Sequence, residues 1–331
     1  MNMIAPVAER LRTGRSFLLS THVRIDGDAI GSVLALSAVL AELGKPHLVL
    51  LPDIIPEAYR FLPGADRAVI VPPGSTVDLP EDADTLVLVD APNIERMGHA
   101  YDHIPENIFT IKIDHHQPSG HRADLELVDP EASSTAEIVH RILRQGGLPL
   151  TLDVAVNLYV AVLTDTGRFT LPNTTAECLR TCAGLVDAGV DPGYIGERLY
   201  RSYSPEVIGL WSDVAGSLRY AAAGQIAVGL VTQEMLARHR VHPADTQDFS
   251  DIPRSVRGVK VGVLLRERRA PLGGFRVSLR SAQVSIDSVA RDFGGGGHRL
   301  AAGFSIEAPL EEAVRRIVDK IEPLLESHHE P

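Results

Sequence analysis

The stretch Lys112-Ile113-Asp114-His115-His116 decides the fold, because a run of apolar residues ends there in an acid and two imidazoles. The run, residues 108–113, has the length and character of a buried strand in a parallel sheet. Open α/β sheets bind ligands beyond the carboxyl ends of their strands. Asp114, His115 and His116 are therefore expected at a functional site. Taken alone, the three residues are a weak signal, and a chance occurrence at a strand end is the simpler explanation.

Three further apolar runs lead into acidic or imidazole side chains. They are residues 17–20, followed by His22, Asp26 and Asp28, residues 86–89, followed by Asp90, and residues 160–163, followed by Asp165. Carboxylates gathered this closely repel one another, and burying one without compensation costs several kcal/mol. Divalent cations relieve the repulsion, and mixed Asp and His donors suit Mn²⁺ better than a metal that prefers thiolates. The residues predict a site for two metal ions.

In this order, the residues resemble the four motifs of the DHH phosphoesterase superfamily, and a downstream segment resembles the DHHA1 domain. That segment contains Phe293, the glycine run 294–297, His298 and Arg299, and then residues 301–304 of sequence AAGF. The resemblance extends over about residues 15 to 306 and is to the short two-domain branch of oligoribonuclease (nano-RNase)/pAp phosphatases. It implies an α/β fold in which a mainly parallel-sheet DHH domain and a smaller α/β DHHA1 domain face each other across a cleft. Ile25 and Ala91 depart from the family pattern, which puts loop detail in doubt but not the metal ligands.

We expect a DHH domain over residues 1–190, a helical connector over 191–222 and a DHHA1 domain over 223–331. The three- and four-residue spacing of apolar residues predicts a helix from Asp28 to Leu43. Ser134 and Glu137 have the spacing of a helix-capping pair, which accounts for the serines without a catalytic role. Further strands are expected at 47–51, 68–71, 226–231, 259–265 and 275–279, and further helices at 174–188, 191–203, 286–292 and 310–325.

The resemblance also assigns roles to the residues of the first domain. It implies that His22, Asp26 and Asp90 bind one Mn²⁺, and that Asp28, Asp90, His115 and Asp165 bind the other, with Asp90 as the bridge. Two such ions activate a shared water and stabilise the charge that develops on the phosphoryl oxygen and the leaving group. Mg²⁺ is the alternative ion. Asp114 is expected to orient neighbouring groups, and His116 to act as a general acid or to stabilise the pentacoordinate phosphorus.

The second half of the chain contains a predicted phosphate-binding segment. Four successive glycines allow a backbone to approach a ligand and to direct N–H groups at an anion. The residues expected to bind substrate are Gly295, Gly296, Gly297, His298, Arg299, Arg268 and Arg168. Residues 254–299 contain ten Lys and Arg against three acids, although the whole chain has a net charge of −11. A local basic surface of this kind suits a short phosphorylated ligand better than a long duplex, and a solvated charged face is the alternative.

Mn²⁺-dependent hydrolysis of short oligoribonucleotides to mononucleotides is the favoured function. The resemblance adds the linear dinucleotides pApA and pGpG, and pAp, as substrates. A RecJ-like exonuclease acting on single-stranded DNA is the first alternative, and a nucleotide sensor with a vestigial metal site is the second. The segment 294–298 argues against an inorganic pyrophosphatase of the same superfamily. Related proteins are often dimers, and a homodimer stays open for this chain.

Composition places the chain among ordinary globular proteins, with 331 residues, 44% hydrophobic and 23% charged. The two cysteines, Cys178 and Cys182, form no CxxC motif and indicate a reducing compartment. No apolar segment reaches the length of a membrane span. A cytoplasmic location without membrane association is therefore expected.

Overall fold

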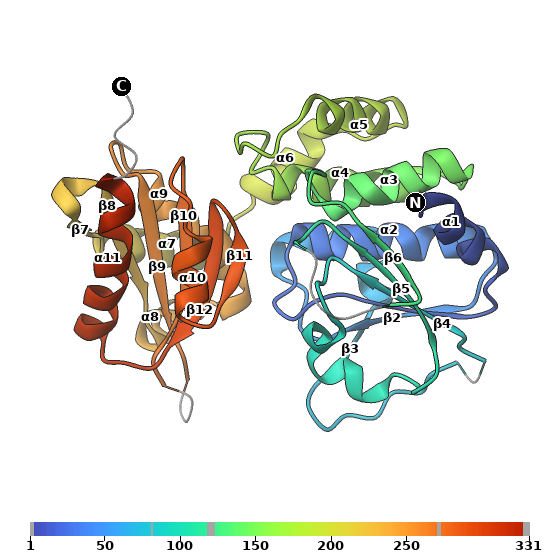
Figure 1. The fold of residues 1–331 in the computed structure, drawn as a ribbon, viewed down its shortest axis with the longest axis horizontal. Helices are drawn as coiled ribbons and strands as arrows, with labels where there is room; N and C mark the ends of the chain where they lie inside the picture. The colour runs from blue at the N-terminus through green and yellow to red at the C-terminus, as the bar shows by residue number, and fades with distance from the viewer. Residues whose placement is uncertain (1–2, 81, 118–122, 270–272, 327–331) are drawn as a thin grey trace. The chain divides into compact units, whose positions relative to one another are not determined.

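The computed structural model describes residues 3–80, 82–117, 123–269 and 273–326, without the side chains of Gln247 and His298 (Figure 1). The chain divides into two compact units, Met1–Ser202 and Tyr203–Pro331. Each contains a six-stranded sheet with helices, which confirms the predicted α/β class. The segment expected as a connector is divided between the units, because α6 (Pro192–Tyr200) belongs to the first and α7 (Pro205–Gly216) to the second.

The first unit is built on a fully parallel sheet with the strand order β3-β2-β1-β4-β5-β6. Its strands are β1 (Phe17–Ser20), β2 (His47–Leu51), β3 (Val69–Ile70), β4 (Thr85–Val89), β5 (Phe109–Asp114) and β6 (Leu125–Val128). Its other helices are α1 (Ile4–Thr13), α2 (Gly27–Glu42), α3 (Thr135–Gly146), α4 (Leu152–Asp165) and α5 (Ala176–Asp187), with short 3-10 segments η1 (Glu57–Tyr59), η2 (Ala65–Arg67) and η3 (Ile94–His103). The strand order reverses between β1 and β4, and such a reversal is where open α/β sheets bind ligands.

Helix α2 is buried on almost every side because it lies between the sheet and α4 (Figure 1). Gly27 and Gly31 make this close approach possible, since a side chain at either position would collide with Thr164 or with the Asn157 carbonyl of α4. The apolar run before Asp165 belongs to α4 and is a helix, whereas the three other runs are strands. Packing α2 on α4 brings the first turn of α2 beside the last turn of α4.

The second unit contains a mixed sheet with the strand order β11-β12-β10-β9-β8-β7, in which only β8 and β9 of the described strands pair in parallel. Its strands are β7 (Arg219–Ala221), β8 (Ile226–Val231), β9 (Val261–Glu267), β10 (Phe275–Ser281), β11 (Gly296–His298) and β12 (Ala301–Ile306). Its other helices are α8 (Gln233–His239), α9 (Asp251–Arg254), α10 (Asp287–Asp292) and α11 (Leu310–Glu326), with η4 (Ala222–Gly224) and η5 (Pro243–Ser250). One face of the sheet packs with α10 and α11, and the other packs in part with α7, α8 and α9.

Most of the predicted elements are present within one to three residues of their expected ends. The helices beginning at Gly27, Ala176, Pro192 and Leu310 confirm the sequence patterns that predicted them. Helices α1, α8 and α9 and strands β6, β7, β11 and β12 were not predicted. Within the described part of the chain, every helix is too short or too polar to cross a bilayer.

Candidate metal centre

Eight predicted side chains meet at the edge of the parallel sheet where the strand order reverses. Asp90 directly follows β4, Asp114 is the last residue of β5, and His22 lies two residues beyond β1. Two helices supply three more: Asp26 and Asp28 lie at the start of α2, and Asp165 is the last residue of α4. His115 and His116 follow β5. We call His22, Asp26, Asp28, Asp90, His115 and Asp165 the metal centre.

The first group of possible metal ligands consists of His22, Asp26 and Asp90. The His22 Nε2 atom lies 3.7 Å from Asp26 Oδ2 and 3.4 Å from Asp90 Oδ2. Donors bound about 2.1 Å from one ion, at angles near 90–110°, are about 3 to 3.5 Å apart. The three atoms are therefore spaced for a shared ion, and the longer separation exceeds the usual length of a hydrogen bond.

The second group consists of Asp28, His115 and Asp165. The His115 Nε2 atom lies 3.8 Å from an oxygen of Asp28 and 3.8 Å from an oxygen of Asp165. It is also 3.6 Å from Asp90 Oδ1, whereas His22 approaches Asp90 Oδ2. One carboxylate thus offers a different oxygen to each group, which is the arrangement of a ligand that bridges two ions.

Backbone carbonyl groups determine which nitrogen of each histidine is available to a metal. His22 Nδ1 lies 2.7 Å from the carbonyl oxygen of Val23, and His115 Nδ1 lies 3.4 Å from that of Ala132. A carbonyl only accepts hydrogen bonds, so each Nδ1 carries the hydrogen. The lone pair is left on Nε2, the atom that faces the carboxylates, as in typical metal-binding histidines.

The beginning of α3 supports two of the carboxylates, a role that sequence reasoning missed. The backbone N–H groups of Thr135 and Ala136 donate to Asp28 over 2.7 and 3.0 Å, and the Ser32 hydroxyl donates to it over 3.0 Å. The Thr135 hydroxyl donates to Asp90 over 2.9 Å. The free N–H groups of a helix N-terminus favour an anion. The sequence predicted only the cap of this helix, and Ser134 does accept from the N–H of Glu137.

Asn173 supports Asp165 in a similar way. Its side-chain amide donates to Asp165 Oδ2 over 3.3 Å, to the Asp165 carbonyl over 3.1 Å and to the Ser133 carbonyl over 2.9 Å. These contacts connect the end of α4 with the loop before α3. The sequence contains no local signal for this role, because Asn173 lies in an irregular segment that only the fold brings back to the ligand.

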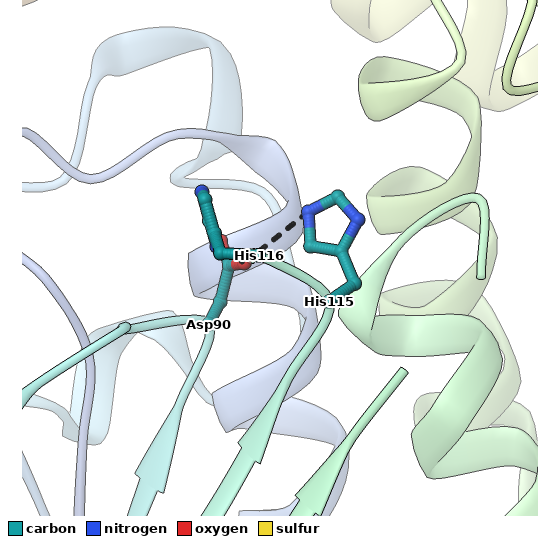
Figure 2. Close-up of side chains that lie close together, drawn as sticks. All are labelled: Asp90, His115 and His116. Atoms are coloured by element: carbon teal, nitrogen blue, oxygen red, sulfur yellow. Dashed lines mark ion pairs between the residues drawn. The ribbon is translucent and has the colours of Figure 1, made fainter. Parts of the chain in front are cut away.

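His116 is oriented by Asp114. The His116 ring donates from Nδ1 to Asp114 Oδ1 over 2.7 Å, and its backbone N–H donates to the same oxygen over 3.2 Å. Burial raises the pKa of Asp114, but these hydrogen bonds and the nearby imidazoles outweigh burial, so the net pKa is lowered. The His116 side chain is 27% exposed and its Nδ1 is 3.6 Å from Asp90. Figure 2 shows His115 and His116 reaching Asp90 from the loop after β5.

Burial dominates the electrostatics of the metal centre. It raises the pKa of Asp90 well above the usual value, and the charges of Asp28 and the other nearby carboxylates raise it further. It also raises the pKa of Asp28 and lowers that of His22. Asp90 additionally has a left-handed backbone, with φ 55°, which is a strained conformation for a residue with a side chain. The folded metal-free centre therefore binds protons at Asp28 and Asp90 more tightly than free carboxylates do, and a divalent cation would compete with those protons.

The glycine run of the second unit begins the edge strand β11. A side chain at Gly295 would collide with the Gly303 carbonyl, and one at Gly297 would collide with Ala301. A side chain at Gly294 or Gly296 would have no described neighbour within 4 Å. Gly295 and Gly297 are therefore required for packing on β12, and Gly294 and Gly296 are not. Arg299 is exposed and donates to the Gln283 carbonyl over 3.1 Å. The His298 side chain lies outside the described part of the structure.

Strand register gathers basic side chains that sequence reasoning had not singled out. On β10, Arg276, Ser278 and Arg280 alternate with buried apolar residues and so share the face opposite the α10–α11 core. Arg276 lies opposite Arg266 of β9. Arg266 donates to Thr246 and to Ser278, and Arg280 lies 3.8 Å from Asp251. The facing residues of β12 are small. We call Arg266, Arg276, Ser278 and Arg280 the arginine face.

Two arginines predicted to bind substrate have other partners. Arg268 lies 3.5 Å from Glu307, beyond the end of β9. Arg168 belongs to the first unit and its guanidinium stacks over the Tyr200 ring at 4.3 Å. Neither is among the residues that the structure gathers in the metal centre or on the arginine face.

Comparisons with known proteins agree with the motifs. Residues 16–162 match the DHH family, N-terminal domain, and residues 223–327 match the DHHA1 domain. The chain is 33% identical to the bifunctional oligoribonuclease and PAP phosphatase NrnA of Thermus thermophilus, over 92% of this chain and 88% of that protein. It is 27% identical to the protein of the same name from Bacillus subtilis, over 95% and 96% of the two chains.

A solved structure supports the same assignment. An exopolyphosphatase-related protein from Bacteroides fragilis has a TM-score of 0.86 and 26% identity, and the match covers 98% of this chain and 97% of that one. The resemblance inferred from the motifs is thereby confirmed. The chain belongs to the DHH/DHHA1 phosphoesterase family, in the group of bifunctional oligoribonuclease and PAP phosphatases.

Proposed function

We propose that the protein hydrolyses short oligoribonucleotides and linear dinucleotides such as pApA and pGpG to mononucleotides, and pAp to AMP, with two Mn²⁺ ions. The observation that carries the proposal is that one oxygen of Asp90 faces His22 and its other oxygen faces His115, which belong to two different donor groups. The names of the Thermus and Bacillus relatives supply the substrate class. Two imidazoles among carboxylates favour Mn²⁺ over Mg²⁺, which prefers oxygen ligands and retained waters.

The residues fit such a pair of ions by number, spacing and tautomer. His22, Asp26 and Asp90 would hold one ion, and Asp28, His115, Asp165 and Asp90 would hold the other. When bound, the ions provide Lewis acidity that activates a water and neutralises charge on the phosphoryl group. Asp114 orients the His116 ring through Nδ1, so the ring is placed to give a proton to the leaving oxygen.

The second unit binds the non-reacting phosphate of the substrate. Gly296 presents an open stretch of backbone on β11 and Arg299 is exposed, while the half-buried cations of the arginine face lie on β9 and β10 of the same sheet. Guanidinium groups pair with phosphate oxygens through two parallel hydrogen bonds. We thus assign catalysis to the domain over residues 1–190 and substrate binding to the one over residues 223–331.

A substrate panel tests the function. The purified full-length protein with Mn²⁺ is offered pAp, pApA, pGpG, a five-nucleotide RNA, a 25-nucleotide single-stranded DNA and pyrophosphate, with an EDTA-treated sample as control. The dinucleotides and the short RNA are expected to yield mononucleotides, and pAp is expected to yield AMP. Preference for the 25-nucleotide DNA would instead indicate a RecJ-like exonuclease. Tight binding of pApA without turnover would indicate a sensor.

A further inference from the structure

Hydrogen bonds fix the backbone of Arg96 beside the metal centre. It lies on η3, six residues after Asp90, and its carbonyl accepts the N–H of Val23 over 2.7 Å. Its own N–H donates to the Asn93 side chain over 3.2 Å. Val23 directly follows His22 in sequence, so these two hydrogen bonds hold the backbone of Arg96 next to a loop that carries a predicted ligand.

The residues after Arg96 restrict its position further. Met97 is fully buried in the core beneath η3. Gly98 has a left-handed φ of 52°, and a side chain there would lie 2.7 Å from the Val23 side chain. The chain therefore turns away immediately after Met97 and remains pressed against the loop of His22. Arg96 is thus placed by the fold rather than by its own side-chain contacts.

The Arg96 guanidinium has no anionic partner within the described residues. Its Nε is buried and lacks a hydrogen-bond partner, and no described carboxylate lies within ion-pair distance of the group. Leaving a buried donor of a charged group unpaired is costly. The Arg96 carbonyl accepts the N–H of Val23, the residue after His22, so the side chain starts beside the metal centre.

The Arg96 guanidinium is suited to bind the phosphate group of an incoming substrate. Four carboxylates of the metal centre neutralise two divalent cations, and Asp114 adds a further negative charge nearby. A phosphate that approaches this centre therefore gains from an additional positive group. Arg168 is already stacked on Tyr200. Arg96 has an unused donor.

We propose that Arg96 binds a non-bridging oxygen of the scissile phosphate and holds it against the metal centre. The inference rests on the function proposed above and adds a substrate-binding residue to the first unit. Guanidinium suits the task because its planar donors match two phosphate oxygens and its charge does not depend on pH. An ammonium at the same position keeps the charge but loses the paired hydrogen bonds.

The test compares Arg96→Gln and Arg96→Lys with the wild type, as full-length proteins loaded with Mn²⁺. The substrates are pApA and bis-p-nitrophenyl phosphate, a small diester with the same reacting group. Arg96→Gln is expected to lower kcat/KM by roughly 10- to 100-fold on both substrates, and Arg96→Lys by less. Arg12→Gln, which removes an exposed arginine paired with Glu9 on α1, is the matched control and should change neither rate.

Metal binding and thermal stability separate substrate binding from structural support. Arg96→Gln should bind Mn²⁺ as tightly as the wild type or more tightly, because a positive charge near His22 has been removed. Its Tm should be unchanged. Weaker Mn²⁺ binding in this variant would overturn the proposal and make Arg96 a support of the metal centre. An unchanged rate, or a loss confined to pApA, would also overturn it.

Sulfur substitution locates the contact on the phosphate. Each non-bridging oxygen of the dinucleotide is replaced by sulfur in turn, and the rate penalty is measured for the wild type and Arg96→Gln. For one of the two sulfur-substituted isomers, the rate penalty should be smaller in Arg96→Gln than in the wild type. Sulfur in that isomer weakens the hydrogen bond to Arg96, and the variant has already lost that bond. Equal penalties in both proteins would contradict a contact at the scissile phosphate. A wild type that hydrolyses neither substrate would refute the proposed function itself, a different result from any of these.

Discussion

The metal centre of the first unit and the arginine face of the second unit both concentrate charge, but they do so in opposite ways. The carboxylates Asp28 and Asp90 are almost completely buried, and backbone or hydroxyl donors hold them in place. Arg276 and Arg280 are only half-buried, and Arg280 lies 3.8 Å from Asp251 of α9. Buried like charges are costly and persist where function requires them, whereas partly exposed charges are screened by solvent.

Because the two regions hold charge differently, changes in them should have different effects on activity. A change in the metal centre should act on every substrate, because it alters the reacting group. A change in the second unit should act in a graded way and only on substrates with a second phosphate to bind. The following experiments test that distinction.

Removing the shared carboxylate has the largest expected effect. Asp90→Ala deletes an oxygen from each donor group, so turnover of pApA should fall on the order of 1,000-fold and Mn²⁺ pairing should be lost. Turnover at saturating Mn²⁺ and metal content per chain are the measurements. Asp187→Ala, which removes an exposed carboxylate at the end of α5, is the control. Retention of more than about a tenth of wild-type turnover would exclude a bridging role.

Removing the histidine beside the metal centre should reduce turnover without releasing metal. His116→Ala is expected to lower kcat on the order of 100-fold, the usual contribution of a general acid. Metal analysis should still find about two Mn²⁺ per chain. His99→Ala, at an exposed histidine of η3 paired with Asp102, provides the control. Loss of an ion from the His116 variant would show that His116 is a ligand instead.

Removing a cation from the second unit should affect one substrate only. Arg299→Ala is expected to lower kcat/KM on pApA by roughly 10- to 100-fold, since a hydrogen bond between charged groups is lost. Bis-p-nitrophenyl phosphate has no second phosphate and should be hydrolysed at the wild-type rate. Arg291→Ala, which removes a neighbouring exposed arginine of α10, is the control. Equal losses on both substrates would mean that Arg299 supports the fold.

The metal centre should also reduce the stability of the metal-free protein. In Asp90→Asn the amide tolerates the left-handed backbone and still accepts from Thr135, so the free energy of unfolding at pH 8 should rise by about 1 kcal/mol. The raised pKa means that folded wild type binds a proton more tightly than the unfolded chain, so wild-type stability falls as pH rises. The extra unfolding free energy of Asp90→Asn over the wild type should become smaller at acidic pH, as measured by denaturation without metal. A less stable variant at pH 8 would contradict this account.

Arg268 should have the smallest effect. Its ion pair with Glu307, a well-exposed partner, is worth less than about 1 kcal/mol. Arg268→Ala should therefore change kcat/KM on pApA by no more than about threefold. A loss as large as that of Arg299→Ala would return Arg268 to the substrate-binding residues.

The sequence alone determined the residues of the metal centre and the class of the fold. Each acid or imidazole follows an apolar run closely in the sequence. The run and the polar residue can therefore both be recognised without coordinates. The glycine run was recognisable for the same reason, although its packing against β12 shows that Gly295 and Gly297 serve packing. The capping of α3 was also predictable from residues three apart.

Only the tertiary structure decided how these residues cooperate. Asp28 and the N–H of Ala136 are 108 positions apart in sequence, and they meet because the sheet, α2 and α3 pack together. Strand register, rather than the number of basic residues, places Arg276 and Arg280 on one face and leaves Arg268 with Glu307. Arg96 shows the same limit, because the contact of η3 with the loop after β1 places its Nε, which lacks a hydrogen-bond partner among the described residues. Such contacts depend on distances that arise when separate segments bury their apolar faces against one another.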